Sequence, residues 1–435
     1  MVIQSNLVKQ CQSYLKNTNR IIRSVDSPFI LSIPQLSPTS ESFLTLKYVE
    51  DLNKKDALFL VRNTIVGLLR VFILSLGVRI SSRTIQYKYQ SLVISHDVIN
   101  NGAENDFYFG SQKEISELCG GSNKLIYIAH SLFTYLRRKN LLYINRNLSI
   151  YSYFLLILWY TKSMVFGFHV YLKKPKSKFR YLILKAALRG DGLESYLRSS
   201  GLLKLLSKYS NGDHFSIFLT IEGHSWEKMV IKSLRESNLK KLVIYGYSHS
   251  VVRGSTVWIK NLDNKFISPD ILLISQKIYY DHISHLWKDK YLYAELRLYR
   301  SLKLQIKYNI TNLASDPHIL ILPEGLESEE DLFLEFASQI SKLHPDLKIS
   351  VKWHPNALKR INRNDSNKIS IFSEVVNYTH IIYRGTYGIF DFLGAEKKLL
   401  YLTGFNIPNT NPLFVFPESF IEISNVEELI EIVGN

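Results

Sequence analysis

The segment Glu222–Glu227 combines two carboxylates with a glycine, directly after the apolar, β-rich run 216–221. A carboxylate at the end of a buried strand lies at the mouth of a sheet, where Glu222 could act as a general base. Gly223 allows a sharp turn toward a ligand because it has no side chain. Glu227 falls in the first turn of the following helix, where the helix dipole favours its charged form. We interpret Glu222 as a catalytic residue and Glu227 as either a helix cap or a substrate contact.

The run 241–247 predicts a second strand, and polar side chains follow it at Ser248, His249, Ser250 and Arg253. Histidine can donate a hydrogen bond to a phosphate or a carboxylate and can exchange a proton near neutral pH. Arginine can pair with either anion through two parallel hydrogen bonds. We predict a catalytic role for His249 and substrate binding by Ser250 and Arg253. The alternative is a structural, hydrogen-bonded His249.

Two further strand ends lie in the C-terminal half of the chain. His354 and Pro355 close the run 347–353, and the proline restricts the residue before it to an extended conformation, which aims the imidazole outward. Glu324 and Gly325 follow the run 318–323. We predict that these four residues contact a bound nucleotide.

Arg384, Gly385 and Thr386 stand between the predicted strand 380–384 and a helix. A glycine and a hydroxyl at a helix N-terminus can bind an anion, because the first backbone N–H groups of a helix have no partner within it. We predict that Thr386 caps the helix, binds a phosphate, or does both. Arg384 and Gly385 belong to the same predicted phosphate site.

Several motifs are absent from the full sequence. It contains no Asp-x-Asp triplet, no His-x-x-x-His pair, no phosphate-binding P-loop and no Gly-x-Ser-x-Gly elbow. Without Asp-x-Asp, no metal site and no cofactor is expected, and phosphate charge must be neutralised by Arg, Lys, His and helix N-termini. The Gly-x-Gly-x-x-Gly fingerprint of dinucleotide binding is also missing.

The elements that position these residues are short apolar strands alternating with amphipathic helices, a pattern typical of parallel sheets covered on both faces. We predict residues 1–50 as an irregular lead-in, 51–205 as mainly helical and 206–310 as α/β, the last two forming one domain. Residues 311–435 are predicted to form a Rossmann-like nucleotide-binding domain. The fold class is α/β, with two Rossmann-like halves facing a cleft. The predicted strands are 216–221, 241–247, 271–275, 318–323, 347–353, 380–384, 398–402 and 420–424.

Composition narrows the choice of partners. The 435 residues carry a formal net charge of +16, which indicates an anionic partner such as a nucleotide-linked substrate or a lipid surface. Basic residues are spread out, and no zinc-finger or RNA-binding pattern occurs, so nucleic-acid binding is not expected. Two cysteines, Cys11 and Cys119, and the lack of an apolar leader indicate a cytoplasmic protein.

The run 148–161 has no charge, and after Lys162 an apolar stretch continues to Leu172. Fourteen residues are too few to span a bilayer, which takes about 20. A buried core helix, an interfacial helix and a spanning helix all remain open. Residues 57–78 predict a second apolar helix, with Arg62 and Arg70 near one face. Peripheral attachment to the inner membrane face is therefore expected.

The runs IEGHSWEKMVI (221–231) and GYSHSVVR (246–253) resemble a family of bacterial surface carbohydrate biosynthesis proteins, over roughly residues 210–435. The motif order is also similar to that of GT-B-type sialyltransferases and Kdo transferases. In those enzymes an acidic motif supplies the base, and His-Pro and Ser/Thr motifs hold the nucleotide. Ile221 stands where the first acidic residue of that motif would be.

This resemblance implies a GT-B-like, metal-independent, inverting glycosyltransferase. The donor would be a nucleotide sugar, such as a CMP-linked nonulosonic acid or Kdo, and the acceptor a surface polysaccharide or lipopolysaccharide. Glu222 would take the acceptor proton, and His354 and Thr386 would stabilise the departing phosphate. The alternatives are a CDP-glycerol-type polyol-phosphate transferase and a non-catalytic scaffold of polysaccharide assembly.

Overall fold

The chain divides into two compact units. The N-terminal unit contains residues 9–249 and 256–299, and the C-terminal unit contains 300–435 together with two short segments. The computed structural model describes residues 13, 28–33, 59–76, 91–96, 123–128, 142–143, 150–173, 178–209, 215–237, 239, 241–248, 267–274, 293–296, 317–324, 327–353, 370–371, 378–393, 397–403, 411–414 and 416–434.

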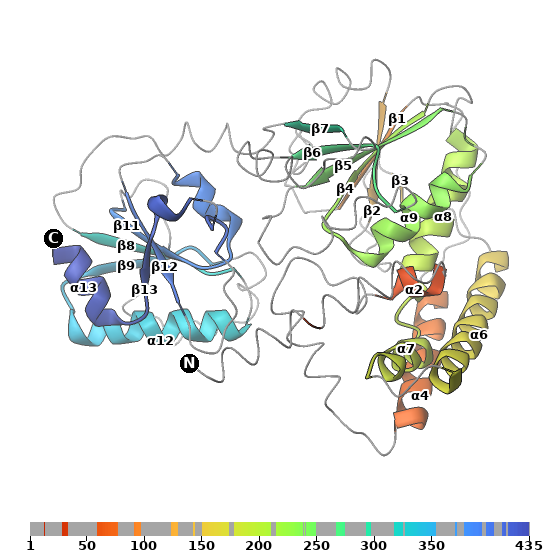
Figure 1. Cartoon of the computed structure of the whole chain (residues 1–435), viewed down its shortest axis with the longest axis horizontal. Coiled ribbons are helices and arrows are strands. Elements are labelled where there is room, and N and C mark those ends of the chain that lie inside the picture. Colours follow the sequence, from red (N-terminus) through yellow and green to blue (C-terminus); the bar gives the residue numbers. More distant parts are fainter. Residues whose placement is uncertain are drawn as a thin grey trace. The chain divides into compact units, whose positions relative to one another are not determined.

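The N-terminal unit is built on a parallel sheet with the strand order β3-β2-β1-β4-β5-β6-β7 (Figure 1). Strand β1 lies beside β4, and from this pair the sheet grows toward β3 on one side and toward β7 on the other. This reversal is the strand order of a Rossmann-type sheet. Its strands are β1 Ser91–His96, β2 Asn123–Ile128, β3 Leu142–Tyr143, β4 Phe215–Thr220, β5 Leu242–Ser248, β6 Ile271–Ile274 and β7 Tyr293–Leu296.

Helix α9 (Ser225–Arg235) follows β4 and is buried along most of its length. Its outer side is covered by α8 (Leu193–Tyr209) and by α2 (Pro28–Ser32). Serines join α8 to α9, since Ser195 Oγ lies 3.0 Å from Ser225 Oγ and Ser199 Oγ lies 2.6 Å from Ser233 Oγ. Small hydroxyl side chains allow the two helices to approach closely and satisfy each other's hydrogen-bonding groups.

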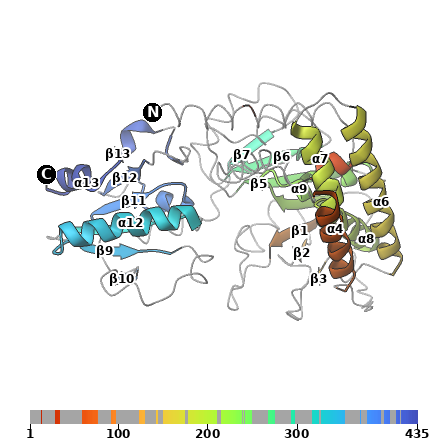
Figure 2. The same ribbon diagram turned by 90° about the horizontal axis from the view of Figure 1, so that it is seen from below.

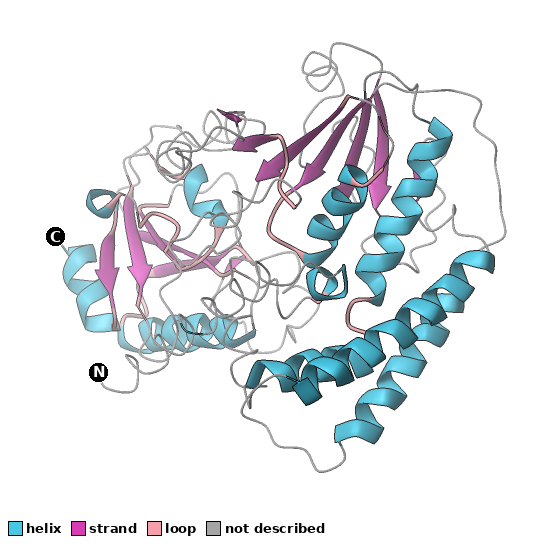
Figure 3. Cartoon of the chain, turned by 45° about the vertical axis from the view of Figure 1, so that its right-hand side comes forward, coloured by secondary structure: helices cyan, strands magenta, loops and turns pink. Residues whose placement is uncertain are grey.

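A group of three helices packs together in the same unit: α4 (Phe59–Leu76), α6 (Ile150–Lys173) and α7 (Lys178–Arg189), visible in Figure 3. Gly67 of α4 and Gly167 of α6 make the close approach to α7 possible. A Cβ atom at Gly67 would overlap the carbonyl oxygen of Leu188, and one at Gly167 would overlap the Ala187 side chain. An ion pair between Arg70 and the buried Asp191 links α4 to the end of α7.

The C-terminal unit contains a second parallel sheet, with the order β10-β9-β8-β11-β12-β13. Here β8 and β11 are the neighbours from which the sheet grows in both directions, so its order is also of the Rossmann type. Helices α12 (Glu327–Leu343) and α13 (Val426–Gly434) supply apolar side chains to its core (Figure 2). The strands are β8 His318–Leu322, β9 Lys348–Val351, β10 Ser370–Ile371, β11 His380–Tyr383, β12 Lys398–Leu402 and β13 Ile421–Ile423.

The predicted α/β class with two Rossmann-like halves is confirmed, because every described strand pair is parallel and both sheets have the Rossmann order. All eight predicted strands are present, shifted by at most a few residues. The cleft between the halves stays a prediction.

The prediction of a mainly helical segment over 51–205 is incomplete. Helices α4, α6, α7 and most of α8 lie there, but so do β1, β2 and β3, three of the strands of the first sheet. The lead-in at 1–50 also contains a helix, α2, whose residues Phe29, Ile30 and Leu31 are buried. The C-terminal unit begins at Arg300, upstream of the boundary predicted near 310.

Replacing Gly67 by alanine should destabilise the N-terminal unit, because the new methyl group overlaps the backbone of α7. We expect a loss of about 1–3 kcal/mol, the usual cost of overpacking a close helix contact. The midpoint of thermal unfolding measures it. The matched control is Gly434→Ala, since a Cβ atom there meets nothing within 4 Å. Equal midpoints for the two variants would contradict the close packing of α4 on α7.

Candidate functional site

The turn between β4 and α9 carries the predicted catalytic carboxylate. Ile221 leaves the strand, and Glu222, Gly223 and His224 follow before α9 begins at Ser225. Gly223 has a φ of 86°, in the left-handed region that residues with a side chain adopt only at a cost. This conformation reverses the chain within one residue, and Glu222 and His224 thereby come close enough for their side chains to meet.

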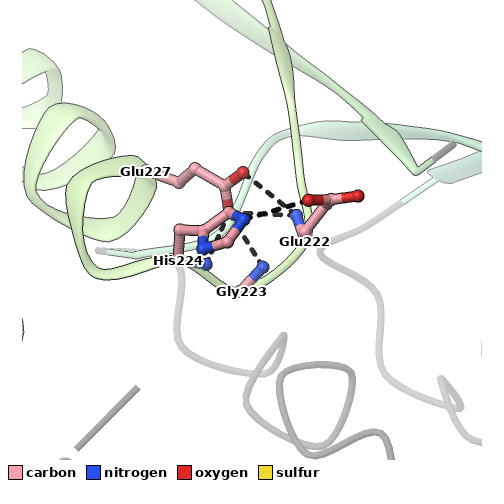
Figure 4. Close-up of polar contacts among 4 residues, drawn as sticks. All are labelled: Glu222, Gly223, His224 and Glu227. Atoms are coloured by element: carbon pink, nitrogen blue, oxygen red, sulfur yellow. Dashed lines mark hydrogen bonds and ion pairs between the residues drawn. The ribbon is translucent and has the colours of Figure 1, made fainter. Parts of the chain in front are cut away.

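Glu227 holds this turn from inside the protein (Figure 4). Its carboxylate accepts hydrogen bonds from the backbone N–H groups of Glu222 at 3.0 and 3.1 Å, of Gly223 at 2.8 Å and of His224 at 2.8 Å. His224 is the N-cap of α9, so the last of these bonds is one half of a capping box. Three consecutive amides are thus satisfied by one side chain, and the turn has a single defined conformation.

The substrate contact predicted for Glu227 is wrong in the described geometry. Its side chain is 1% exposed, and both carboxylate oxygens are engaged by the backbone of its own turn. Of the two roles left open, the structure selects the helix cap. Glu227 is therefore a positioning residue for Glu222 and His224.

The pKa of Glu227 is raised to about 7, chiefly by burial and with a smaller contribution from Glu222, against the lowering effects of His224 and of the backbone donors. The neighbouring Lys228 is also buried, and burial lowers its pKa to about 8 although Glu227 acts in the opposite direction. Two consecutive ionisable residues, one acidic and one basic, are therefore held away from water. Each has a pKa displaced toward neutrality because its charged form loses hydration.

Glu222 and His224 form a pair on the outer side of the turn (Figure 4). Oε2 of Glu222 lies 2.9 Å from Nε2 of His224, and because an ionised carboxylate only accepts hydrogen bonds, the imidazole N–H donates. Both side chains are partly exposed, at 22% for Glu222 and 36% for His224. A carboxylate paired with an imidazole at an accessible turn can accept a proton and share it within the pair.

His224 was absent from the predicted site. The signal that could have identified it was the i, i+2 spacing across Gly223, since a positive φ at the middle residue brings the flanking side chains together. The segment 91–96, which ends at His96, was not predicted to be a strand. His96 is the last residue of β1, two positions beyond Ile94, which pairs with Leu219 of β4.

The pair lies where the strand order of the first sheet reverses. Glu222 follows β4, and β4 and β1 are the two neighbours from which the sheet grows in opposite directions. In open parallel sheets the crevice for ligands forms at the carboxyl ends of the strands at this reversal, because the two crossover connections leave on opposite faces. The sheet therefore places Glu222 and His224 at the edge where open parallel sheets commonly bind ligands.

The second sheet has the same arrangement. Strands β8 and β11 are the neighbours at its reversal, and their carboxyl ends lead into Glu324 and into Gly385 and Thr386. Thr386 is the N-cap of the 3₁₀ helix η6 (Tyr387–Asp391), and its hydroxyl accepts a hydrogen bond of 3.2 Å from the Gly388 N–H. The capping role predicted for Thr386 is confirmed, and its phosphate contact stays a prediction.

The predicted nucleotide contact of Arg384 is wrong. This arginine is fully buried, and its Nη1 donates a hydrogen bond of 2.5 Å to the carbonyl oxygen of Leu402 at the end of β12. Its guanidinium also lies 5.5 Å from the ring centre of Tyr401. Arg384 therefore joins the carboxyl ends of β11 and β12 inside the unit.

The remaining predicted residues lie outside the described part of the chain: His249, Ser250, Arg253, Gly325, His354 and Pro355. Of these, His249 directly follows β5 and His354 comes three residues after the end of β9. Within the described residues, no group of three or more His, Cys, Asp or Glu side chains could hold a metal ion.

Comparisons with known proteins return structures only at low similarity. No protein-family model matches the sequence, and no curated protein matches it. A solved glycotransferase of kitacinnamycin is 9% identical with a TM-score of 0.42, covering 80% of this chain and 91% of its own. A UDP-forming trehalose-phosphate synthase from Burkholderia vietnamiensis is 10% identical with a TM-score of 0.39, covering 78% and 87%.

The wall teichoic acid polymerase TagF is also 10% identical, with a TM-score of 0.39, covering 86% of this chain and 88% of its own. TM-scores this low carry no argument on fold or function. The fold assignment therefore rests on the strand order of this chain.

The stability of the N-terminal unit should fall as the pH rises from about 4.5 to about 7 on account of Glu227. In this window the unfolded chain has lost the proton that the folded state retains, so the free energy of unfolding decreases with pH, by on the order of 3 kcal/mol in all. In the Glu227→Gln variant the side chain at 227 cannot titrate, so this part of the pH dependence of the free energy of unfolding should disappear. Thermal unfolding at a series of pH values measures it.

The control for this measurement is Glu335→Gln, at an exposed position of α12. It should keep the slope of the unchanged protein. A Glu227→Gln protein with the same slope as this control would show that Glu227 does not titrate in the window.

Proposed function

We propose that the chain is a metal-independent, inverting glycosyltransferase that moves a sugar from a nucleotide donor onto a surface polysaccharide or lipopolysaccharide acceptor. The observation that carries the proposal is the position of the polar residues on the two sheets. Each unit has Rossmann strand order, and in each unit candidate residues follow a strand at which the order reverses: Glu222 and His224 follow β4, Glu324 follows β8, and Gly385 and Thr386 follow β11. One chain with two such edges has room for two ligands, a donor and an acceptor.

Glu222 is the proposed base. It would take the proton of the acceptor hydroxyl as that oxygen attacks the anomeric carbon of the donor, while the bond from that carbon to the phosphate oxygen breaks. His224 supports this role, because its imidazole is 2.9 Å from the carboxylate and can stabilise the ionised form before the reaction. Glu227 supports it indirectly by holding the backbone of the turn.

The C-terminal unit would bind the donor nucleotide. Gly385 and Thr386 follow β11, and Glu324 follows β8, so all three lie at the reversal of the second sheet. The proposed phosphate contacts are the Thr386 hydroxyl and the imidazole of His354. Pro355, next to His354, and Gly325, next to Glu324, are proposed as further contacts of the nucleotide. Hydrogen-bond donors at the leaving phosphate stabilise the charge that develops there without a metal ion.

The sequence resemblance suggests the donor class, a CMP-linked nonulosonic acid or Kdo. These sugars carry a carboxylate, and His249, Ser250 and Arg253 would recognise such anionic groups. The competing proposals are a transferase that uses CDP-glycerol and a scaffold without catalysis. A panel of nucleotides in a thermal-shift experiment separates them, since a ligand that binds only the folded state raises the unfolding midpoint.

Three results are informative. Stabilisation by CMP, followed by transfer from CMP-sugars, supports the proposal. Turnover of CDP-glycerol but not of CMP-sugars assigns the polyol-phosphate reaction instead. The absence of stabilisation by CMP, UDP, GDP or CDP-glycerol argues for the scaffold.

Glu222→Gln should lower the transfer rate by at least about a hundredfold, because the amide cannot accept the acceptor proton. The amide oxygen can still accept the hydrogen bond from His224, so the turn should keep its conformation. The nucleotide-induced rise in unfolding midpoint should therefore be unchanged. The control is Glu236→Gln, an exposed position at the C-terminal end of α9. A Glu222→Gln protein as active as the control would remove Glu222 from the mechanism.

Thr386→Val should weaken nucleotide binding by about tenfold, because it replaces the hydroxyl by a methyl group of similar size. Thr386→Ser keeps the hydroxyl and should bind nearly as the unchanged protein does. Binding is measured by calorimetric titration with the nucleotide that gives the largest thermal shift. Thr386→Val also removes the cap of η6, whereas Thr386→Ser keeps it. Equal nucleotide affinity of the two variants would show that the hydroxyl does not contact the phosphate.

A further inference from the structure

Exposed apolar side chains are concentrated on two helices of the N-terminal unit. Among the described residues, 14 of the 17 exposed large hydrophobic side chains belong to α4 or α6. Soluble proteins usually scatter such residues singly over their surface, and a concentrated set marks an interaction site. On α4 they are Leu60, Val61, Ile65, Leu68, Leu69, Phe72 and Ile73, and on α6 they are Tyr151, Phe154, Ile157, Leu158, Val165, Phe168 and Leu172.

The exposed side chains of α6 recur at intervals of three and four residues, so they form one stripe along the whole helix. The opposite side of α6 buries Ser152, Ser163 and Gly167 together with Leu156 and Tyr160. Seven large apolar residues of the helix thus face outward, while its small and polar residues face inward beside Leu156. This is the reverse of the arrangement expected for a helix that faces water.

The buried polar groups of α6 have partners inside the protein. The Tyr160 hydroxyl donates to the carbonyl oxygen of Leu188 at 2.6 Å, and the Ser163 hydroxyl donates to that of Trp159 at 2.8 Å. Lys204 Nζ donates to the hydroxyl of Ser152 at 2.5 Å. These inward polar groups are therefore hydrogen-bonded within the protein.

Helix α4 repeats the inversion. Its buried residues are Asn63 and Gly67, and Arg70 turns inward to pair with Asp191. Glycine at the contact with α7 lets the two backbones approach, as small residues do where helices pack in a lipid environment. Both α4 and α6 pack on α7, so the two inverted helices belong to one layer (Figure 3).

The charges on the two helices indicate which partner covers them. Neither α4 nor α6 contains an Asp or Glu residue, whereas Arg62, Lys162, His169 and Lys173 are exposed. A second copy of the chain would bring cations against cations. An anionic lipid surface offers both phosphate groups for these cations and a hydrocarbon layer for the apolar stripe.

Length alone would allow α6 to cross a bilayer. Tyr151–Lys173 is 23 residues long, and a stretch of 18 residues within it has a mean hydropathy of 1.3 and is 28% buried. Lys162 lies near the middle of this segment, where a spanning helix would hold its charge at the bilayer centre at high cost. A helix lying in the plane of the headgroups lets Lys162 extend to the phosphates while the apolar stripe faces the acyl chains.

We propose that α4 and α6 dock the protein onto an anionic bilayer and lie in its interface without crossing it. This inference is independent of the proposed transfer reaction, because it uses none of the site residues.

The test is co-sedimentation of the full chain with vesicles of phosphatidylcholine mixed with phosphatidylglycerol, compared with vesicles of phosphatidylcholine alone. Leu172→Glu on α6 should weaken binding to the mixed vesicles by about tenfold, since it removes a large apolar side chain and adds a negative charge. The matched control is Leu343→Glu at the end of α12, also an exposed leucine of a helix, and it should bind normally.

Lys162→Gln tests the charge separately. It should weaken binding to the mixed vesicles by about fivefold and leave binding to phosphatidylcholine unchanged. Circular dichroism and the unfolding midpoint verify that each variant is folded, and since all three positions are exposed, no change is expected.

Four results would overturn the proposal. The full chain could fail to sediment with the mixed vesicles, or Leu343→Glu could lose as much affinity as Leu172→Glu. A dimer in solution that Leu172→Glu dissociates would assign the surface to a second copy of the chain. Resistance of the bound protein to extraction at alkaline pH would assign α6 as a spanning helix.

Discussion

The carboxylate of Glu227 bonds to three consecutive backbone amides, and the geometry of the candidate site depends on this interaction. A tight turn between a strand and a helix leaves amides that cannot bond within either element, and such groups are costly when they are away from water. By satisfying them, Glu227 holds the turn in one conformation, with Gly223 at its positive φ. The side chains of Glu222 and His224 then meet on the outer side of the turn.

The energetic cost of this arrangement appears in the titration of the groups concerned. Glu227 and Lys228, consecutive residues of α9, are both buried, and burial moves the pKa of each toward neutral pH. The same burial makes the hydrogen bonds of Glu227 strong, because water does not compete for them. Burying these two groups costs stability, and it fixes the backbone that carries Glu222 and His224.

The N-terminal unit has two regions that differ in which side chains they expose: the sheet with α9, and the group of α4, α6 and α7. Around the sheet, apolar strands such as β4 and the helix α9 are buried, and polar groups appear at strand ends. In the group of α4, α6 and α7, the apolar residues of α7 are buried, whereas α4 and α6 expose large apolar side chains and bury serine, asparagine and glycine. The proposed docking of α4 and α6 on a lipid surface would account for this difference, since apolar side chains gain by leaving water.

Much of the fold follows from the sequence because parallel strands are short, continuous apolar runs, and their burial on both faces makes them easy to identify. The runs around Ile217, Ile321 and Ile382 predict strands that the structure contains. Glu222 and Thr386 could also be identified, since a polar residue directly after such a run must lie at the sheet edge. Strand β1, with the run SLVISH, has too few apolar residues to be distinguished from a loop.

The tertiary structure decided what the neighbouring residues do. Arg384 and Glu227 have the residue types of ligand contacts, yet both are buried, because the carbonyl of Leu402 and the amides of the β4–α9 turn surround them. The partnership of Glu222 with His224 needed the positive φ of Gly223. A sequence alone determines the periodicity of burial along each element, whereas the partner of a polar group depends on which segments, distant in the chain, the fold brings beside it.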